Sequence, residues 1–573
     1  MFLTADPQVT SITCTQSSRK LTTMKTKLSQ PLLRSQILQR MIQSAFFIVA
    51  SIAMMPTQAK ETQTPTSQEE KGSQDTTGRA RPNILFIYTD DQSYRTVSCY
   101  SDAYPWVRTP NIDQLARDGV RFEHAYIGSW CMPSRASMLT GLHQHGIESM
   151  RMEGQYPGSS YDPEKLHFWP SVMRDNGYTT AHIGKWHTGR DTGFGRDWDH
   201  QIVWNRPGYP ENAPNYYDNQ LISVDGGPPT MTKGYSTDNY TNWAVDFIQR
   251  ESESTKPWYL WLCYGAVHGP FTPANRHLEA YADLEVPVPA DIYPPRPNKP
   301  GYVQQMEHWE PGKDGFPVER KTRDVSPVGM KDVPGRSLKE WIRQYHQGVL
   351  AIDEGVGRLL EALQATGQDQ DTLIIFTSDQ GFAWGQHGFK SKVAPYRATV
   401  EAPFLIRPPS GSSPQIKGRV ISNPVSGVDI PPTILASAGI KLPWKMHGED
   451  LSPLFNTLSS KRTSPAMLVH TGKLYGSDTN TIPRQDDPTL YHGPGVPWYV
   501  MLASGKFKYI RNLIDGETEE LYDLDRDPDE LNNLAMKKLY RWRLRKMRES
   551  AVEELVRTEA GLVNQLPSIK NRK

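Results

Sequence analysis

The sequence predicts an α/β fold: a large, mostly parallel or mixed sheet sandwiched by helices, with a smaller C-terminal α+β subdomain. Continuous apolar runs predict strands buried on both faces of the large sheet, and the clearest are Asn83–Thr89, Trp258–Cys263 and Thr372–Thr377. Apolar residues at three- and four-residue spacings predict a long amphipathic helix from Leu338 to Leu363. Near the C-terminus, short segments between turn residues predict an antiparallel sheet followed by a helix.

The composition of the 573-residue chain excludes a global field that would attract nucleic acid or membrane. Lys and Arg total 64 and Asp and Glu total 63, so any selectivity for anions must be local. The chain has only four cysteines, which is too few for a disulfide framework. Cys99 and Cys263 either form a disulfide or remain two free thiols, and the sequence leaves both possibilities open.

The first 59 residues resemble a targeting segment, because basic residues precede an apolar run from Ala45 to Met55 and small residues follow it. Eleven apolar residues are too few to span a bilayer, so we expect export to the periplasm or medium without a stable membrane anchor. Met24 and Met41 are alternative starts. Residues 60–81 are polar and predict a disordered linker. The large domain then covers residues 82–460, and the subdomain covers 461–573.

The first predicted strand, Asn83–Thr89, ends at Asp90 and Asp91. Ligands bind beyond the carboxyl ends of strands in open α/β sheets, so this pair is a candidate site for a hard cation. A cap on the next helix is the simpler alternative, and neither reading is favoured by these residues alone. A short helix from Thr109 to Gly119 and a strand from Val120 to Ala125 follow.

Cys131 is predicted to begin a helix, because Pro133 suits a first turn and Gly141 suits a C-terminal stop. A helix N-terminus favours anions and lowers the pKa of a thiol, and Arg135 would direct its guanidinium to the same place. A buried cysteine in an ordinary helix is one alternative. A cysteine phosphatase loop is another, but it needs five residues between Cys and Arg, and here there are three.

The pattern C-x-P-S-R at residues 131–135, followed by Leu-Thr-Gly at 139–141, resembles the signature of type I sulfatases in the alkaline-phosphatase-like superfamily. The resemblance extends over roughly Arg81 to Ala535. It implies that a formylglycine-generating enzyme oxidises Cys131 during maturation, and that the hydrated aldehyde of formylglycine is the nucleophile. Cys131 would then not act as a thiol.

Further segments resemble the same family. Gly184-Lys185-Trp186-His187 follows the strand-like run 177–183, and the resemblance implies that Lys185 contacts a sulfate oxygen while His187 exchanges a proton with the hydrate. His268 follows the strand Trp258–Cys263 and aligns with the family histidine that binds sulfate and protonates the leaving oxygen. Considered separately, each of these residues is more simply a surface lysine or a core histidine.

The strand Thr372–Thr377 delivers Asp379 and Gln380. The resemblance implies a metal shell of Asp90, Asp91, residue 131, Asp379 and the Gln380 carbonyl, although many relatives have Asn at the last position. Oxygen ligands favour one Ca²⁺ per chain, with Mg²⁺ second. Downstream, the family lysine that touches sulfate corresponds best to Lys392, with Lys390 as the alternative.

These residues converge because Asp90, Lys185, His268 and Asp379 each stand just past a predicted buried strand, at one edge of the sheet. The resemblance implies that one hydroxyl of the hydrate attacks sulfur while Arg135, Lys185, His268 and Lys392 hold the developing charge. His268 or Lys392 protonates the leaving alcohol, and His187 helps the second hydroxyl to expel sulfate.

Two stretches, Trp198–Trp243 and Glu285–Gly335, lack strong periodicity and predict long loops. Their aromatic residues suit sugar rings, although packing onto the sheet explains them equally well. We therefore favour a sulfated carbohydrate substrate, with a small aryl or choline sulfate ester as an alternative. A metal phosphohydrolase and a non-catalytic sugar-binding relative are further alternatives. The basic C-terminal helix, Leu534–Arg557, is interpreted as a solvated face and not as a nucleic-acid site.

Overall fold

The structure is a computed structural model that describes residues 81–147, 151–153, 158–160, 166–320, 336–410, 416–458, 462–472, 477–493 and 495–569. The predicted targeting segment lies outside these residues, as does the linker except for Arg81. Within the described part of the chain, no helix combines the length and apolar character needed to cross a membrane.

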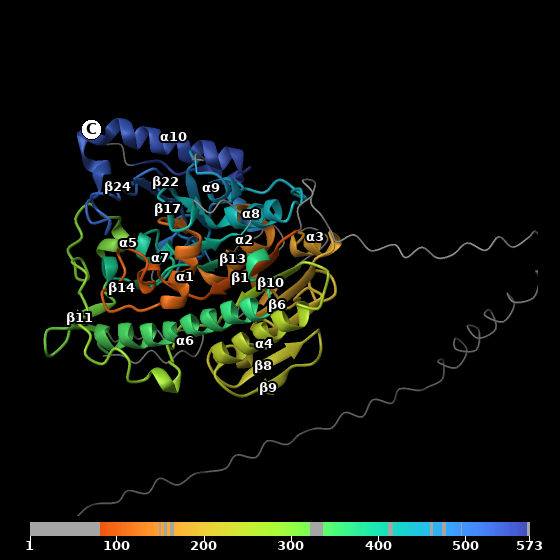
Figure 1. The fold of residues 1–573 in the computed structure, drawn as a ribbon. Coiled ribbons are helices and arrows are strands. Elements are labelled where there is room, and N and C mark those ends of the chain that lie inside the picture. Colours follow the sequence, from red (N-terminus) through yellow and green to blue (C-terminus); the bar gives the residue numbers. More distant parts are fainter. Residues whose placement is uncertain are drawn as a thin grey trace, which may run out of the picture. The chain divides into compact units, whose positions relative to one another are not determined.

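A ten-stranded mixed sheet forms the centre of the molecule, and its middle strands are parallel (Figure 1). The order of strands across it is β17-β2-β16-β13-β1-β10-β6-β7-β8-β9. Their bounds are β1 Asn83–Thr89, β2 Val120–Phe122, β6 Thr179–Trp186, β7 His200–Asn205, β8 Gln220–Val224, β9 Thr230–Thr232, β10 Trp258–Cys263, β13 Thr372–Ser378, β16 Phe404–Arg407 and β17 Arg419–Ile421. The predicted fold class is confirmed.

Alternating residues of β1 enter two different hydrophobic cores, because successive side chains of a strand point to opposite faces. Phe86 and Tyr88 join the core under α2 (Cys131–Thr140), α3 (Pro170–Asp175) and α8 (Ile430–Ser437). Leu85 and Ile87 join the core under α1 (Pro110–Asp118), α4 (Ser236–Glu251) and α6 (Leu338–Ala365). Helices therefore cover both faces, as the continuous apolar strands predict (Figure 1).

Two predicted helices are confirmed together with their end signals. Helix α6 starts at a capping box formed by Ser337 and Glu340. Helix α2 begins at Cys131 and stops at Gly141, whose φ of +72° favours glycine. The shorter elements are β3 Ala125–Tyr126, β4 Arg151–Glu153, β5 Gly158–Ser160, α5 Gly301–Gln304, β11 Trp309–Pro311, β12 Pro317–Glu319, β14 Ala383–Trp384, β15 Lys390–Ser391, α7 Arg397–Val400, β18 Val425–Ser426, α9 Ser452–Asn456, β20 Tyr491–His492 and β21 Val496–Pro497.

The prediction of a loop over Trp198–Trp243 is wrong. This stretch contributes β7, β8, β9 and the first half of α4. Five of its aromatic rings are buried in the cores on the two faces of the sheet, so they pack instead of lining an open sugar site: Trp198, Trp204, Tyr216, Tyr217 and Tyr240. The described part of Glu285–Gly335 contains only the short elements α5, β11 and β12.

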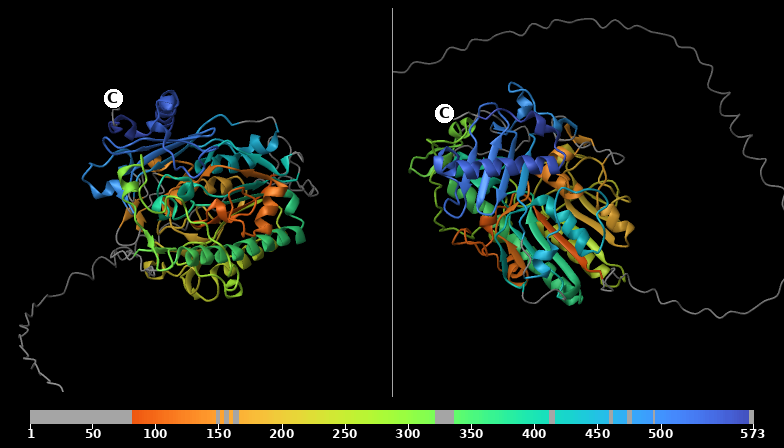
Figure 2. Two further views of the ribbon diagram at one scale, coloured as in Figure 1. Left: turned by 90° about the vertical axis from the view of Figure 1, so that its left-hand side faces the viewer. Right: turned by 90° about the horizontal axis from the view of Figure 1, so that it is seen from above.

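The C-terminal sheet is antiparallel, in the order β19-β22-β23-β24, with bounds Ala466–His470, Tyr499–Ser504, Phe507–Asn512 and Glu520–Asp523. Helix α10, Arg541–Arg557, lies across it (Figure 2). It starts later than predicted, because short 3₁₀ turns at Leu534–Met536 and Lys538–Tyr540 precede it. Cys99 and Cys263 are both free thiols.

The His182→Phe variant is expected to gain about 2 kcal/mol of stability over the wild type when the pH falls from 7.5 to 5. His182 lies among Trp186, Trp198 and Trp261, and neither ring nitrogen has a hydrogen-bond partner. Burial, then the Arg135 charge, lowers its pKa to about 3. In the unfolded chain His182 has a pKa of about 6.5 and binds a proton below that pH, whereas the buried ring stays neutral. The free energy of unfolding of the wild type therefore falls as the pH is lowered from about 6.5 to 3.

Urea unfolding at the two pH values measures this difference. The matched control is His167→Phe, because His167 is exposed. An equal stability difference at both pH values in the His182 variant would contradict the prediction.

Candidate functional site

The site forms at the carboxyl ends of β1 and β13, which pair in parallel with Thr89 opposite Ser378. The residues that follow, Asp90 and Asp379, therefore lie side by side, and the Asp91 amide donates to Asp379 Oδ1 at 3.0 Å. Ligand atoms of Asp90, Asp91, Cys131 and Asp379 all lie within 4.8 Å of one another, and all four residues are buried. The structure thus brings the predicted carboxylates and Cys131 together.

Cys131 faces this cluster from the N-terminus of α2. Its Sγ lies 3.2 Å from Asp90 Oδ1, 2.9 Å from Lys392 Nζ and 3.4 Å from Gln380 Nε2. The expected lowering of its pKa is wrong, because burial and then the Asp90 charge raise the pKa of the thiol to about 12. An unmodified Cys131 is therefore a poor nucleophile in this position.

Three cations pair with the three carboxylates. Lys185 forms an ion pair with Asp90, Lys392 Nζ lies 2.7 Å from Asp91 Oδ1, and Arg135 Nη2 lies 3.0 Å from Asp379 Oδ2. Lys185 was predicted to lie just past the end of a strand. It is instead the seventh residue of β6. The structure brings Arg135, Lys185 and Lys392 to the cluster, and each of these cations is engaged by a carboxylate.

The pKa values of the three carboxyl groups differ although all are buried. Burial opposes ionisation of Asp90, but the adjacent Lys185 overcomes it and holds the Asp90 pKa well below its usual range. Burial and then the Asp90 charge raise the pKa of Asp379 to about 7. Burial raises the pKa of Asp91 despite the opposing effect of Lys392. Close, buried carboxylates of this kind need more positive charge than the lysines and arginine supply.

His268 approaches the cluster from the loop after β10. Its Nε2 lies 3.6 Å from Asp91 Oδ2, while its Nδ1 lies 2.7 Å from the Gly269 carbonyl, to which it donates. The ring stacks on Tyr216 with centroids 4.0 Å apart. Burial and then Lys392 lower the pKa of His268 well below its usual range. The neutral ring thus presents Nε2 to the site.

Arg206 is a site residue that sequence reasoning missed. Its Nη1 lies 3.2 Å from Nδ1 and 3.3 Å from Nε2 of His187, and its guanidinium lies over the Tyr216 ring at 4.7 Å. Burial and then Arg206 lower the pKa of His187, which keeps this ring neutral. Arg206 directly follows β7, which pairs in parallel with β6 and so ends at the same sheet edge. Because β7 was predicted as part of a loop, the sequence did not indicate that Arg206 lies at the end of a strand.

Gln380 and Lys392 reach the cluster, whereas Lys390 points elsewhere. The Gln380 amide nitrogen donates to Asp91 Oδ1, and its oxygen accepts from Ser134 Oγ at 3.4 Å. Rotating this amide by half a turn would present its oxygen to the carboxylates. Lys390 Nζ instead pairs with Glu319 at 2.6 Å and lies over the Trp341 ring at 3.9 Å. Of the two lysines, Lys392 is therefore the one beside Cys131.

The donor set fits a hard divalent cation. Three buried carboxylates and an amide that can present oxygen are the ligands that Ca²⁺ and Mg²⁺ prefer. The raised pKa values of Asp91 and Asp379 point the same way, because added positive charge would favour their ionised forms.

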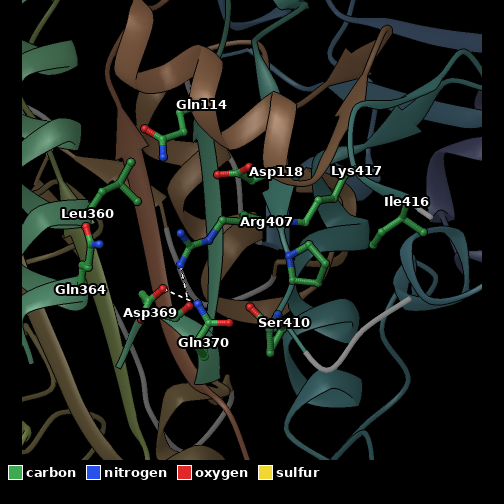
Figure 3. A pocket seen from close by; sticks show the side chains of 12 residues that line it. Gln114, Asp118, Leu360, Gln364, Asp369, Gln370, Arg407, Ser410, Ile416 and Lys417 are labelled. Atoms are coloured by element: carbon green, nitrogen blue, oxygen red, sulfur yellow. Dashed lines mark hydrogen bonds between the residues drawn. The ribbon is translucent and has the colours of Figure 1, made fainter. Parts of the chain in front are cut away.

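Figure 3 shows the residues that line a separate cavity of about 360 Å³. This cavity lies at the amino end of β13, whereas the carboxylate cluster lies at its carboxyl end. Asp369, which precedes the amino end of β13, accepts a hydrogen bond from Arg407 on its backbone carbonyl at 2.8 Å. Lys417 and Asp118 also line this cavity, so its positive and negative charges balance. None of the predicted site residues lies there, and the cavity lacks a net charge that would select a sulfate.

Comparisons with known proteins agree with this geometry. A family model described as Sulfatase matches residues 82–440. An N-acetylglucosamine-6-O-sulfatase from Bacteroides thetaiotaomicron is 29% identical over 504 residues, which cover 80% of this chain and 84% of that protein. A choline-sulfatase from Rhizobium meliloti is 26% identical, with 80% and 83% covered.

A solved structure of a protein bound to its substrate, D-glucosamine-2-N,6-O-disulfate, has a TM-score of 0.68 at 24% identity and covers 84% of this chain and 98% of its own. The phosphonate monoester hydrolase of Agrobacterium radiobacter has a TM-score of 0.60 at 22% identity, with 83% and 96% covered. At these identities the likeness shows the fold.

Proposed function

Because the chain belongs to the sulfatase family and is a sulfuric ester hydrolase, we propose that it releases sulfate from a sulfated carbohydrate. The observation that carries the proposal is the buried cluster of Asp90, Asp91 and Asp379 around Cys131, ringed by Arg135, Lys185 and Lys392. A 6-O-sulfated amino sugar is the favoured unit, since bacterial and human relatives are named as sulfatases of N-acetylglucosamine 6-sulfate.

The proposal includes two groups that the chain must acquire. Formylglycine at position 131 would supply two hydroxyls on one carbon, one to attack sulfur and one to release sulfate afterwards. A divalent cation, Ca²⁺ before Mg²⁺, would be held by Asp90, Asp91, Asp379 and Gln380, and would supply positive charge beside the nucleophile. A formylglycine-generating enzyme is thus a required partner during maturation.

The charges explain why a cation is needed. Three carboxylates balance Arg135, Lys185 and Lys392, so none of these three cations is left for an anionic ester. Two added positive charges on the carboxylates would free the lysines to hold the sulfate oxygens and the charge that develops in the transition state. His268 donates through Nδ1 to Gly269, so it would have to take up a proton on Nε2, beside the negative charge of the ester, to donate to a sulfate oxygen; that proton, or one from Lys392, would then pass to the leaving oxygen.

His187 would act as a base and take the proton from the hydroxyl that expels sulfate. Burial and Arg206 lower the pKa of His187 and so keep its ring neutral before this step. Export, the linker over 60–81 and the division into domains 82–460 and 461–573 are part of the same proposal. They rest on the sequence pattern alone.

Sulfate release from a panel of esters tests the proposed substrate class. We expect 6-O-sulfated glucosamine derivatives to exceed aryl sulfates and choline sulfate by at least about tenfold in kcat/KM, because sugar hydroxyls add contacts that strengthen in the transition state. The matched control ester carries its sulfate on another ring carbon. Faster release from choline sulfate would overturn the carbohydrate assignment, and faster phosphoester cleavage would favour the phosphohydrolase alternative.

A further inference from the structure

Leu539 is the most exposed large apolar residue in the described part of the chain, and it lies within an unusually basic segment. Between Leu531 and Arg548 the chain has seven basic side chains and no acidic one, although basic and acidic residues are nearly equal over the whole chain. We define the basic patch as eight exposed or half-exposed residues of this segment: Lys537, Lys538, Leu539, Arg541, Trp542, Arg543, Arg545 and Lys546. The patch is therefore a local concentration of positive charge on a neutral protein.

Helix α10 turns the patch outward. Its apolar face, formed by Leu544, Met547, Ala551 and Leu555, is buried in the core of the C-terminal subdomain. The opposite face carries Trp542, which is 56% exposed, and Lys546. Figure 2, seen from above, shows α10 lying along the outside of the C-terminal sheet. Five of the eight patch residues therefore lie on α10, and Lys537, Lys538 and Leu539 lie at the 3₁₀ turn that precedes it.

Few of these cations are used within the protein. Arg545 and Lys546 pair with Glu549 on the same helix. Among the described residues, Lys537, Lys538, Arg541 and Arg543 have no acidic partner. Arg543 instead lies over two aromatic rings, 4.5 Å from the centroid of Phe507 and 5.2 Å from that of Trp542. Four cations without an acidic partner, next to the exposed indole of Trp542, are therefore available to bind an anionic ligand.

We propose that the basic patch binds a chain of sulfated polysaccharide, with its cations on the sulfate groups and Trp542 against a sugar ring. The proposal rests on the proposed function in one respect, since it takes the polymeric form of that substrate as the occupant. Dense basic segments bind polyanions such as heparin through charge, and an exposed aromatic face adds contact with the apolar face of a sugar ring. The patch would hold the polymer near the enzyme while its sulfated units reach the site.

A membrane surface and a nucleic acid also carry dense negative charge. Membrane-surface helices bury their apolar face among lipids. The apolar face of α10 is already buried against its own sheet, so only Leu539 and Trp542 remain for such contact. The geometry therefore favours a flexible soluble polyanion.

The test is binding of the full chain to size-fractionated heparin and dextran sulfate, measured at several salt concentrations. The patch variant Lys537→Gln/Lys538→Gln/Arg541→Gln/Arg543→Gln is expected to bind at least about tenfold more weakly, with a shallower salt dependence because fewer counterions are released. The matched control, Lys233→Gln/Lys256→Gln/Lys417→Gln/Lys441→Gln, removes the same charge from exposed positions elsewhere and is expected to bind like the wild type.

Trp542→Ala separates sugar recognition from charge. We expect it to weaken binding of dextran sulfate but not of polyvinyl sulfonate, which has the charge without the rings. Sulfate release from a sulfated monosaccharide should be unchanged in the patch variant, whereas KM for the polymer should rise. Failure of the proposed function would instead remove sulfate release from the wild type.

Equal heparin binding by the patch and control variants would overturn the proposal. Tighter wild-type binding to DNA or to phosphatidylserine vesicles than to heparin would also overturn it, in favour of those partners. Thermal unfolding of each variant confirms that the fold is kept.

Discussion

Replacing Cys131 with alanine is expected to lower sulfate release by at least about 10⁴-fold, because loss of a catalytic nucleophile has effects of this size. Cys131 Sγ lies within 3.4 Å of Asp90, Gln380 and Lys392, so the side chain at position 131 is in direct contact with the cluster. Cys131→Ser is expected to be inactive in steady-state turnover too. A serine that had accepted sulfate would lack the second hydroxyl needed to expel it.

The control is Cys99→Ala, which removes a partly exposed thiol outside the carboxylate cluster and should keep full activity. Intact-mass analysis of the active wild type is expected to show the CH₂SH group of Cys131 replaced by CHO. An active Cys131→Ala variant, or active wild type whose residue 131 is still a thiol, would refute the proposed nucleophile.

Removal of the proposed cation by a chelator is expected to lower activity at least about 100-fold and to lower the thermal unfolding temperature. The raised pKa values of Asp91 and Asp379 show the cost of close, buried carboxylates, and an ion bound only to the native site would relieve it. Adding Ca²⁺ should restore both quantities, with Mg²⁺ less effective. Metal analysis before and after chelation completes the measurement.

The Asp379→Asn variant should lose most of this response, because one oxygen ligand with its charge is removed. Asp353→Asn is the matched control, since Asp353 is also a buried carboxylate with a raised pKa, about 6, but binds the backbone amides of Asn111 and Ile112. Full activity in protein shown to be free of metal would rule out the cation.

The strands that build the site were predictable because they are buried on both faces. β1, β10 and β13 consist of unbroken apolar runs, and Asp90 and Asp379 stand directly after two of them. Parallel pairing then brings the two carboxylates together without further information. Local signals also sufficed for α2, where Pro133 and Gly141 mark its two ends.

Other features depended on tertiary context. β8 and β9 are partly exposed, and the stretch Trp198–Trp243 that contains them has asparagine, aspartate and proline between its aromatic residues, which resembles loop composition. Without β7 paired to β6, Arg206 could not be placed beside His187. The pKa of Cys131 was predicted in the wrong direction, since the helix N-terminus was visible in the sequence but the depth of burial was not.

All ten residues of α2 are buried, and Cys131 is only 2% exposed. A protein catalyst could not reach a side chain this buried, so the proposed conversion of the thiol would have to precede folding of this region. Roughly 240 residues separate Cys131 from β13, which at about 5–20 residues per second leaves roughly 10–50 s of synthesis before closure is possible. The proposed conversion and the folding of α2 would therefore compete for the same unfolded chain.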